Sequence, residues 1–343
     1  MSDLRPGVSE GDGAVQLLAS ARARMSAAAA DLAVPAEHRL TDRERTTFRS
    51  LLGQLVRSVE DELRAGLLAA PLPQGLQAAF SSARVEIAMP LLAERTALGQ
   101  PALIDLLLRR TEEHRLQRSA SAESALLIEL AGDTEESVAR NAMALLIAQS
   151  GRLDGFRDPV IPRADLPAEL EHLLVWTVAA ALRRYMVTIH KAVPTECDAA
   201  LSAAAARVLA RHDEGETVDA RAMHLALALR SAGRLEDDAL LHRSATEGSL
   251  PLFLALLALR TGLAPASVWE VLSAASGLPL LLRAAGVSRD EAASALLAWG
   301  IVEALLPQAL ASFDGTSAEA ARAVLSFWAV DPGYRAAVGR LMQ

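Results

Sequence analysis

The pair His212-Asp213 carries the residue types that metal-dependent chemistry needs. A neutral imidazole and a carboxylate can hold a metal ion that activates water, as in phosphohydrolases of the His-Asp type. His172, His190 and Asp237 are the residues that could complete such a site. However, the seven histidines are scattered without ligand-type spacing, and His212 stands at a predicted helix end, where an imidazole favours the negative terminus. We therefore expect no metal site, and a metal-dependent hydrolase centred on His212-Asp213 is the alternative.

A second group of residues could bind phosphate. Five basic side chains lie close together in the sequence: Arg109, Arg110, His114, Arg115 and Arg118. Positions 110, 114 and 118 share one face of a helix, and guanidinium groups suit phosphate or carboxylate recognition. Two glutamates interrupt the run, and the net charge of −8 opposes attraction to nucleic acid. We expect Arg110, His114, Arg115 and Arg118 to form an interaction face for another protein, with nucleic-acid binding as the alternative.

The other reactive side chains match no catalytic pattern. Cys197 is the sole cysteine, so no disulfide can form within the chain, and it lies near a predicted helix start without a catalytic motif. Neither a Walker phosphate loop nor a G-x-S-x-G elbow is present. We expect no catalytic, cofactor-binding or metal-binding residue. The four tryptophans occupy apolar helical contexts and are expected to be core anchors: Trp176, Trp269, Trp299 and Trp328.

The composition predicts an all-α protein. Apolar residues make up 52% of the 343 residues, but aromatic residues only 3%, because alanine and leucine supply most of the apolar content. Both favour helix, and no run of alternating β-branched residues marks a hairpin. Residues 1–13 have no signal-peptide pattern and are expected to be disordered. No apolar run approaches the roughly 18 residues that span a bilayer, so we expect a cytoplasmic protein.

The segment from Asp133 to Ala142 indicates the architecture that positions these residues. It lies between two apolar helical segments, and Asp133 is a residue type that caps helices. Val138, Ala142, Leu145 and Leu146 then recur at helical spacing. Stacked helical hairpins need such short turns and apolar stripes. The sequence therefore predicts a HEAT-like α-solenoid with a more globular C-terminal helical half.

The helix signals also predict where the chain divides. A capping box at Thr41 and Glu44 opens a long first helix. Periodicity breaks over residues 151–165, which separates a repeat region at 14–165 from a C-terminal helical region at 166–343. In the second region, Leu173 to Leu182 is apolar on all sides and predicts a central helix. Later helices are predicted over 235–243, 289–306 and 317–329, among others.

Several segments, in order, resemble a known bacterial family. The segments are Met89 to Thr96, Leu106 to Leu116, Asp133 to Leu146, Asp165 to Leu170, Leu174 to Arg183, Gly248 to Phe253, Arg260 to Leu263 and Leu282 to Ser288. They are similar to an uncharacterised alphaproteobacterial family called domain of unknown function 2336, over residues 41 to 343. The resemblance implies a HEAT-like helical-repeat protein without an assigned activity. It implies no catalytic residue.

Taken together, these features favour a binding role. We expect a protein–protein interaction adaptor or regulatory scaffold, because stacked hairpins present an extended face with little chemistry of its own. Residues 246–343 carry only 6 arginines and 8 acidic residues. Such a charge-poor segment suits a covered surface, so a homodimer through the C-terminal half is a further possibility.

Overall fold

The computed structural model describes residues 40–69, 77, 80–81, 86–93, 98–119, 125–213, 215, 217–247, 249–274 and 277–341. The disorder expected for residues 1–13 and the first part of the repeat region predicted over 14–165 lie outside these ranges. Across the described residues the structure is helical and contains no strand, apart from an isolated bridge between Leu153 and Pro159. The all-α prediction is confirmed.

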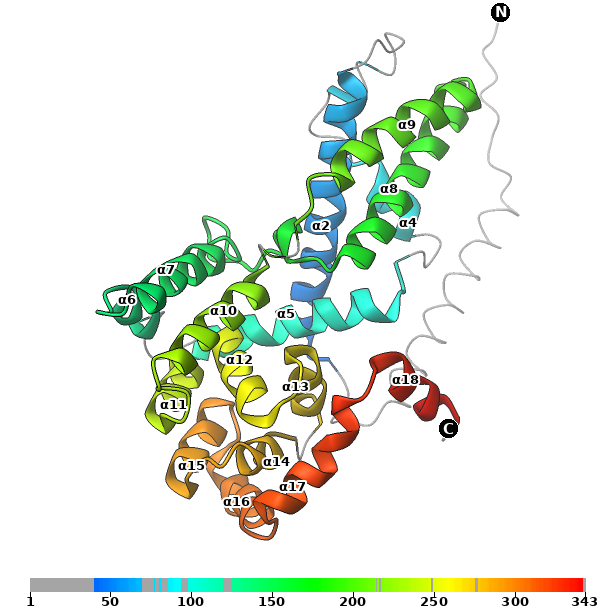
Figure 1. The fold of residues 1–343 in the computed structure, drawn as a ribbon. Helices are drawn as coiled ribbons and strands as arrows, with labels where there is room; N and C mark the ends of the chain where they lie inside the picture. The colour runs from blue at the N-terminus through cyan, green and yellow to red at the C-terminus, as the bar shows by residue number, and fades with distance from the viewer. Residues whose placement is uncertain are drawn as a thin grey trace, which may run out of the picture. The chain divides into compact units, whose positions relative to one another are not determined.

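Figure 1 shows the described helices in their order along the chain. They are α2 (Asp42–Leu68), α4 (Ala88–Ala93), α5 (Pro101–Ser119), α6 (Ala125–Ala131), α7 (Glu136–Ser150), α8 (Ala168–Thr188), α9 (Pro194–Leu209), α10 (Val218–Ser231), α11 (Asp238–Thr246), α12 (Leu250–Thr261), α13 (Pro265–Leu272), α14 (Gly277–Ala284), α15 (Arg289–Ala298), α16 (Leu306–Asp314), α17 (Ala318–Leu325) and α18 (Pro332–Leu341). Short 3-10 turns are η2 (Arg163–Asp165), η4 (Glu303–Leu305) and η5 (Ser326–Ala329). The described residues fall into two units, which divide within α2 between Thr47 and Phe48.

The first helix begins as predicted. The backbone N–H of Thr41 donates to the Glu44 carboxylate (2.7 Å), and the N–H of Glu44 donates to the Thr41 hydroxyl (3.2 Å). These reciprocal bonds satisfy N–H groups that a helix start leaves without partners. The capping box is therefore confirmed.

Two later boundaries differ from the prediction. The single helix predicted over 289–306 is wrong, because α15 ends at Ala298 and Gly300 turns the chain with a φ of +91°. A new helix, α16, then begins at Leu306 with Pro307 in its first turn. Such a left-handed glycine closes a helix without steric penalty. The apolar pattern runs on through the turn, so periodicity alone did not reveal it.

A smaller core gathers α2, α4, α8, α9 and the first half of α5. Its buried side chains include Leu55 and Val59 of α2, Leu107 of α5 and Val178 of α8. A larger core gathers α6, α7 and α10 to α17. At its centre is α12, in which every residue from Leu250 to Ala258 is buried. The most fully buried helix is thus α12. The 173–182 segment, which was expected to form a central helix, has one face in the smaller core and exposes Leu173 and Trp176.

Helix α5 belongs to both cores. Leu103 and Leu107 pack in the smaller core, whereas Leu116 packs in the larger one. Figure 1 shows α5 running between the helices of the two cores. The cores interleave along the sequence, because α6 and α7 join α10 to α17 while α8 and α9 join α2. The junction predicted over 151–165 therefore does not separate them.

The segment that indicated the architecture packs on both sides. Helix α7 contacts α6 and α10, and Val138, Ala142 and Leu145 are buried as their spacing predicted. Asp133 does not cap α7, whose N-cap is Glu135. Instead its carboxylate accepts the N–H of Glu135 (3.0 Å) and binds Arg234 (2.5 Å), so it fixes the turn to the end of α10.

In the described part of the chain, no single helix has both the length and the apolar content of a membrane span. Only α12 and α13 would have both if taken together, and they are bent by 103° at the break between them.

Candidate functional site

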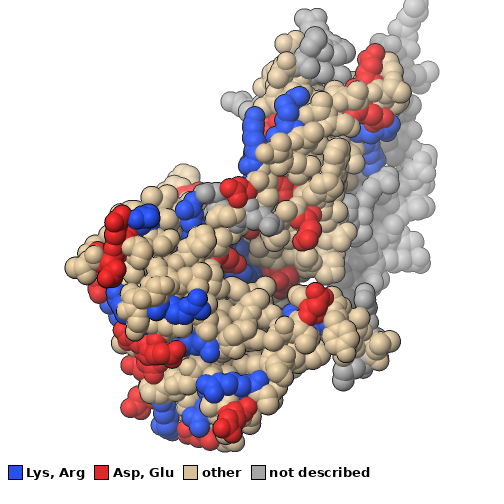
Figure 2. Space-filling view, viewed as in Figure 1, with Lys and Arg blue, Asp and Glu red and all other residues tan. Residues whose placement is uncertain are grey.

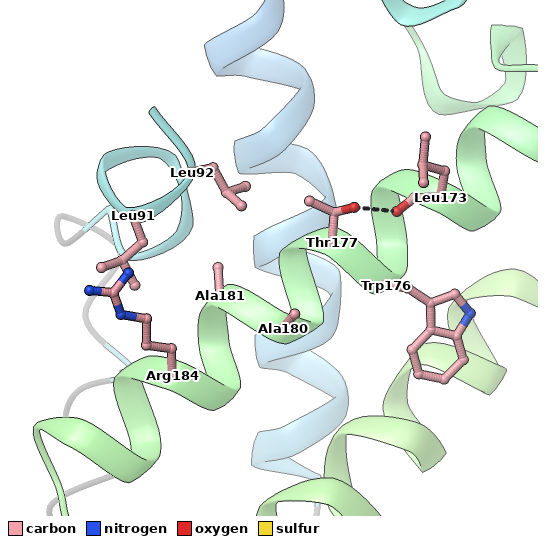
Figure 3. Close-up of a pocket in the computed structure, with 8 residues that line it drawn as sticks. All are labelled: Leu91, Leu92, Leu173, Trp176, Thr177, Ala180, Ala181 and Arg184. Atoms are coloured by element: carbon pink, nitrogen blue, oxygen red, sulfur yellow. Dashed lines mark hydrogen bonds between the residues drawn. The ribbon is translucent and has the colours of Figure 1, made fainter. Parts of the chain in front are cut away.

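An apolar groove lies between α4 and α8 (Figure 3). Its volume is about 500 Å³, and it is lined by Leu91 and Leu92 of α4 and by six residues of α8. Leu173, Trp176, Ala180 and Arg184 recur every three or four positions, so they share one face of the helix. The opposite face of α8 is buried in the smaller core. Helix α8 is therefore apolar on both faces but covered on only one.

The polar groups along the groove are satisfied except at one end. The Thr177 hydroxyl donates to the carbonyl of Leu173 (2.7 Å), as Figure 3 shows. The indole N–H of Trp176 donates to His172 (3.0 Å). The Nη1 atom of Arg184 is buried and has no hydrogen-bond partner. The groove thus combines apolar walls with a guanidinium that lacks an acceptor.

A buried ion pair holds the α4 wall of the groove. Glu60 of α2 lies 3.1 Å from Arg64, and its carboxylate accepts the N–H groups of Ile87 (3.2 Å) and Ala88 (2.8 Å). Arg64 in turn donates to the carbonyl of Phe80 (2.8 Å). Since helix starts have N–H groups without partners, an acidic side chain there is favourable. Local sequence patterns do not predict this contact, because Glu60 and Ala88 are far apart along the chain.

A second buried ionic cluster connects α5, the 151–165 segment and α10. Glu113 lies within 3.4 Å of three guanidinium groups, those of Arg109, Arg110 and Arg152. Arg152 also binds Asp165 (2.6 Å). We call Glu113, Arg109, Arg110, Arg152, Asp165 and Asp219 the ionic junction.

The ionic junction continues to the start of α10. Asp165 accepts the N–H of Val218 (2.8 Å), the first residue of that helix. Asp219, in the first turn of α10, forms a bidentate ion pair with Arg109, with two hydrogen bonds of 2.7 Å each. Bidentate pairs of this kind have fixed geometry. The two acidic residues therefore hold α10 against α5.

Burial and charge act against each other at the junction. Burial lowers the pKa of Arg110 to about 10, although Glu113 opposes the change. Burial also disfavours the charge on Arg109, but Asp219 and Glu113 outweigh it and raise the pKa of that guanidinium. Burial would raise the pKa of Asp219, and Arg109 and Arg152 outweigh it, so that pKa is lowered. Arg109 and Asp219 are therefore held in their charged forms.

The predicted interaction face on α5 is divided by the fold. Arg110 and His114 are 3% and 8% exposed, so they point inward and not toward a partner. Arg110 donates to the carbonyls of Val160 (3.2 Å) and Arg152 (2.5 Å). Arg115 is exposed and pairs with Glu112 (2.5 Å). The side chain of Arg118 is outside the described part. Residues 110 and 114 do lie on one face of α5, but that face is buried inside the protein.

The residues considered for a metal site lie apart. His212 contacts the buried carboxylate of Glu171 through Nδ1, whereas Asp213 accepts the N–H of Gly215 (2.9 Å). The other three have separate partners: His172 accepts the indole N–H of Trp176, His190 contacts Tyr185 edge to face, and Asp237 caps α11. No group of three or more His, Cys, Asp or Glu able to hold a metal occurs among the described residues.

Cys197 and the tryptophans complete the residues singled out from the sequence. Cys197 is buried, and burial raises the pKa of its thiol, which disfavours the reactive thiolate. Trp269 is buried, and Trp299 and Trp328 pack partly buried against the larger core. Trp176 was expected in the core, but it is 38% exposed at the groove.

An exposed apolar stripe lies on α17 and η5. Ala321 and Leu325 bury one side of α17 in the larger core. Ala320, Ala323, Val324 and Phe327 are nevertheless exposed. Their spacing places them on one face of a continuous helical path. We call these four residues the α17 stripe.

Charge is mixed on the face of the molecule shown in Figure 2. Basic and acidic side chains alternate there, without a single basic field. Such a surface has little long-range attraction for phosphate backbones.

Comparison with known families identifies the family of this chain. The model of a family described as an uncharacterised protein conserved in bacteria, domain of unknown function 2336, matches residues 87–326. No curated protein and no solved structure matches the chain.

Proposed function

Because the chain belongs to this family of uncharacterised bacterial proteins, we propose a function from the geometry alone: it is a protein–protein interaction adaptor or scaffold without catalytic activity. The observation that supports this proposal is the α17 stripe. In the finer architecture that we propose, the helices stack as HEAT-like hairpins, which present such helix faces in series. We also propose that the adaptor acts in the cytoplasm.

The stripe has the chemistry of a docking surface. Val324 and Phe327 are 52% and 40% exposed, one turn apart. A surface helix normally turns polar residues outward, so an outward apolar face indicates a covered surface. The alanines at 320 and 323 allow a partner backbone to approach closely. An amphipathic helix of a second protein fits such a face.

The experiment compares two equally apolar, exposed positions. The protein is tagged at its native expression level, lightly crosslinked and captured, with Val324→Asp as the test variant. The matched control is Ile147→Asp on α7, whose side chain is also exposed (64%). We expect a near-stoichiometric partner protein with the parent chain and the control, and its loss with Val324→Asp. A burial penalty for one aspartate in the complex predicts at least a tenfold fall in affinity.

Two results would contradict the adaptor proposal. One is retention of every partner by Val324→Asp. The other is turnover of a phosphoester or nucleotide by the purified parent chain. If the captured partner is a second copy of the chain, its mass in solution doubles and Val324→Asp restores the monomer, which identifies the C-terminal homodimer.

A further inference from the structure

We propose that the α4–α8 groove is a binding site for a small amphiphile with an anionic head and one apolar chain. This site is separate from the α17 stripe, since the groove belongs to the smaller core and α17 to the larger one. The proposal rests on the shape of the groove, its apolar walls and the position of Arg184.

The size of the groove fits a small molecule. Its volume of about 500 Å³ lies inside the usual range of ligand pockets, ~300 to ~1,000 Å³. From Leu173 to Arg184 the α8 face extends roughly 16 Å, at ~1.5 Å per residue. Ala180, halfway along, supplies a low floor between Leu173 and Arg184. The small side chain of Ala180 therefore leaves room for an extended chain along α8.

The walls select an apolar body. Leu91, Leu92, Leu173 and the ring of Trp176 line the groove, and the hydroxyl of Thr177 is already bonded to its own helix. A polar ligand body would therefore lose its hydrogen bonds to water and gain none from the walls. An apolar chain loses nothing and removes exposed leucine and tryptophan surface from water.

The charge selects the head group. Among the described residues that line the groove, Arg184 is the one with a charged side chain, and its Nη1 atom is buried without an acceptor. The rest of the Arg184 side chain is only partly buried, but a buried guanidinium nitrogen without an acceptor is unfavourable. A carboxylate or phosphate oxygen supplies the missing acceptor and can accept two bonds from one guanidinium. Figure 3 shows Arg184 beside Leu91 at one end and Trp176 at the other, which sets the head at Arg184 and the tail toward Trp176.

The test titrates the purified full chain by calorimetry with decanoate, decyl phosphate and decan-1-ol. These probes share one tail, so differences between them report the head group, and the two anions distinguish a carboxylate from a phosphate source. We expect one molecule bound per chain and an affinity at least tenfold higher for one of the anions than for the alcohol. We also expect a change in fluorescence that Trp176→Phe removes without removing binding.

Three variants locate the site. Arg184→Gln is expected to lower anion binding to the level of the alcohol and to leave alcohol binding unchanged. Ala180→Leu fills the floor and is expected to weaken all three probes. Arg230→Gln, at an exposed arginine of α10, is the matched control and is expected to change nothing.

Any one of three calorimetric results would overturn the proposal. The first is equal affinity for the anions and the alcohol, and the second is equal anion affinity in Arg184→Gln and the parent chain. The third is the absence of saturable binding. A change in molecular mass in solution with Arg184→Gln would also overturn it, because the groove would then be an interface between two copies. None of these results bears on the partner capture with Val324→Asp.

Discussion

Glu113 is the residue on which the ionic junction depends most. Its carboxylate compensates three buried guanidinium groups at once. Removing one partner from a buried ionic group leaves an uncompensated charge, which costs about 3–5 kcal/mol. We therefore expect Glu113→Gln to lower the free energy of unfolding by that amount, as measured by urea denaturation.

The neighbouring residue supplies the control. Glu112 lies on the same helix but pairs with Arg115 at the surface, where the two side chains are 28% and 41% exposed. Exposed pairs contribute about 0–1 kcal/mol, so Glu112→Gln should have little effect. Equal losses for the two variants would show that burial of the junction does not matter to stability.

Cys197 gives a second prediction at the level of single residues. Because burial raises the pKa of its thiol, little thiolate is present near neutral pH. We expect an aromatic disulfide reagent to react at pH 8 much more slowly with the folded chain than with the chain in urea. Equal rates in the two states would contradict the buried position of this side chain.

At the level of elements, the Glu60 carboxylate anchors the start of α4. Glu60 accepts the N–H groups of Ile87 and Ala88. We expect Glu60→Gln to speed hydrogen exchange at these two amides, because the start of α4 is no longer anchored. We also expect the variant to bind decanoate in the groove with lower affinity, because α4 forms one wall of the groove. Glu62→Gln is the control, since Glu62 is 38% exposed and pairs with Arg163 instead. Unchanged exchange at Ile87 and Ala88 would contradict this anchoring.

The elements also show what could be predicted from the sequence. Helix class, the capping box at Thr41 and the buried stripe of α7 follow from local spacing, and all are confirmed. Contacts between distant residues carry no such signal, so the pairing of Glu113 with Arg152 could not be foreseen. For the same reason α5 was predicted to expose Arg110, whose burial depends on the carbonyls of residues 152 and 160.

The groove shows the same limit. The sequence shows that the 173–182 segment of α8 is apolar on all sides, but it does not show which side is left uncovered. Arg184 has no acidic residue three or four positions away, which hints at a missing partner. That hint is weak by itself, since many surface arginines share it. The position of α4 in the structure shows that Arg184 lies at one end of a groove.

At the level of the whole molecule, the ionic junction makes the free energy of unfolding depend on pH in the acidic range. Although the side chain of Asp219 is 35% exposed, Arg109 and Arg152 lower its pKa in the folded chain and outweigh the opposing effect of its partial burial. Its contribution is therefore complete above the unfolded value of about 3.9 and is lost as the pH falls through the lowered folded value. We expect Asp219→Asn to reduce the loss of stability in this acidic window, measured as urea midpoints between pH 7 and pH 2.

An exposed pair provides the comparison. Asp314 binds Arg289 at 3.0 Å, with the two side chains 47% and 58% exposed. Asp314→Asn should leave the acid dependence almost unchanged, because solvent screens that pair. If both variants have the same acid profile, the coupling of α5 to α10 does not depend on the charge of Asp219.

The interleaving of the two cores has a consequence for the order in which the protein can form during synthesis. Helices α6 and α7 leave the ribosome before α8 and α9, yet their packing surface lies on α10, and the larger core also needs α12. The leucines of the α6–α7 hairpin therefore stay exposed until α10 and α12 have been synthesised, whereas α8 and α9 can already pack in the smaller core. Hydrophobic surface that is exposed during synthesis promotes aggregation and the binding of chaperones. We conclude that a chain shortened after residue 245 lacks α12 and leaves that hairpin without its core.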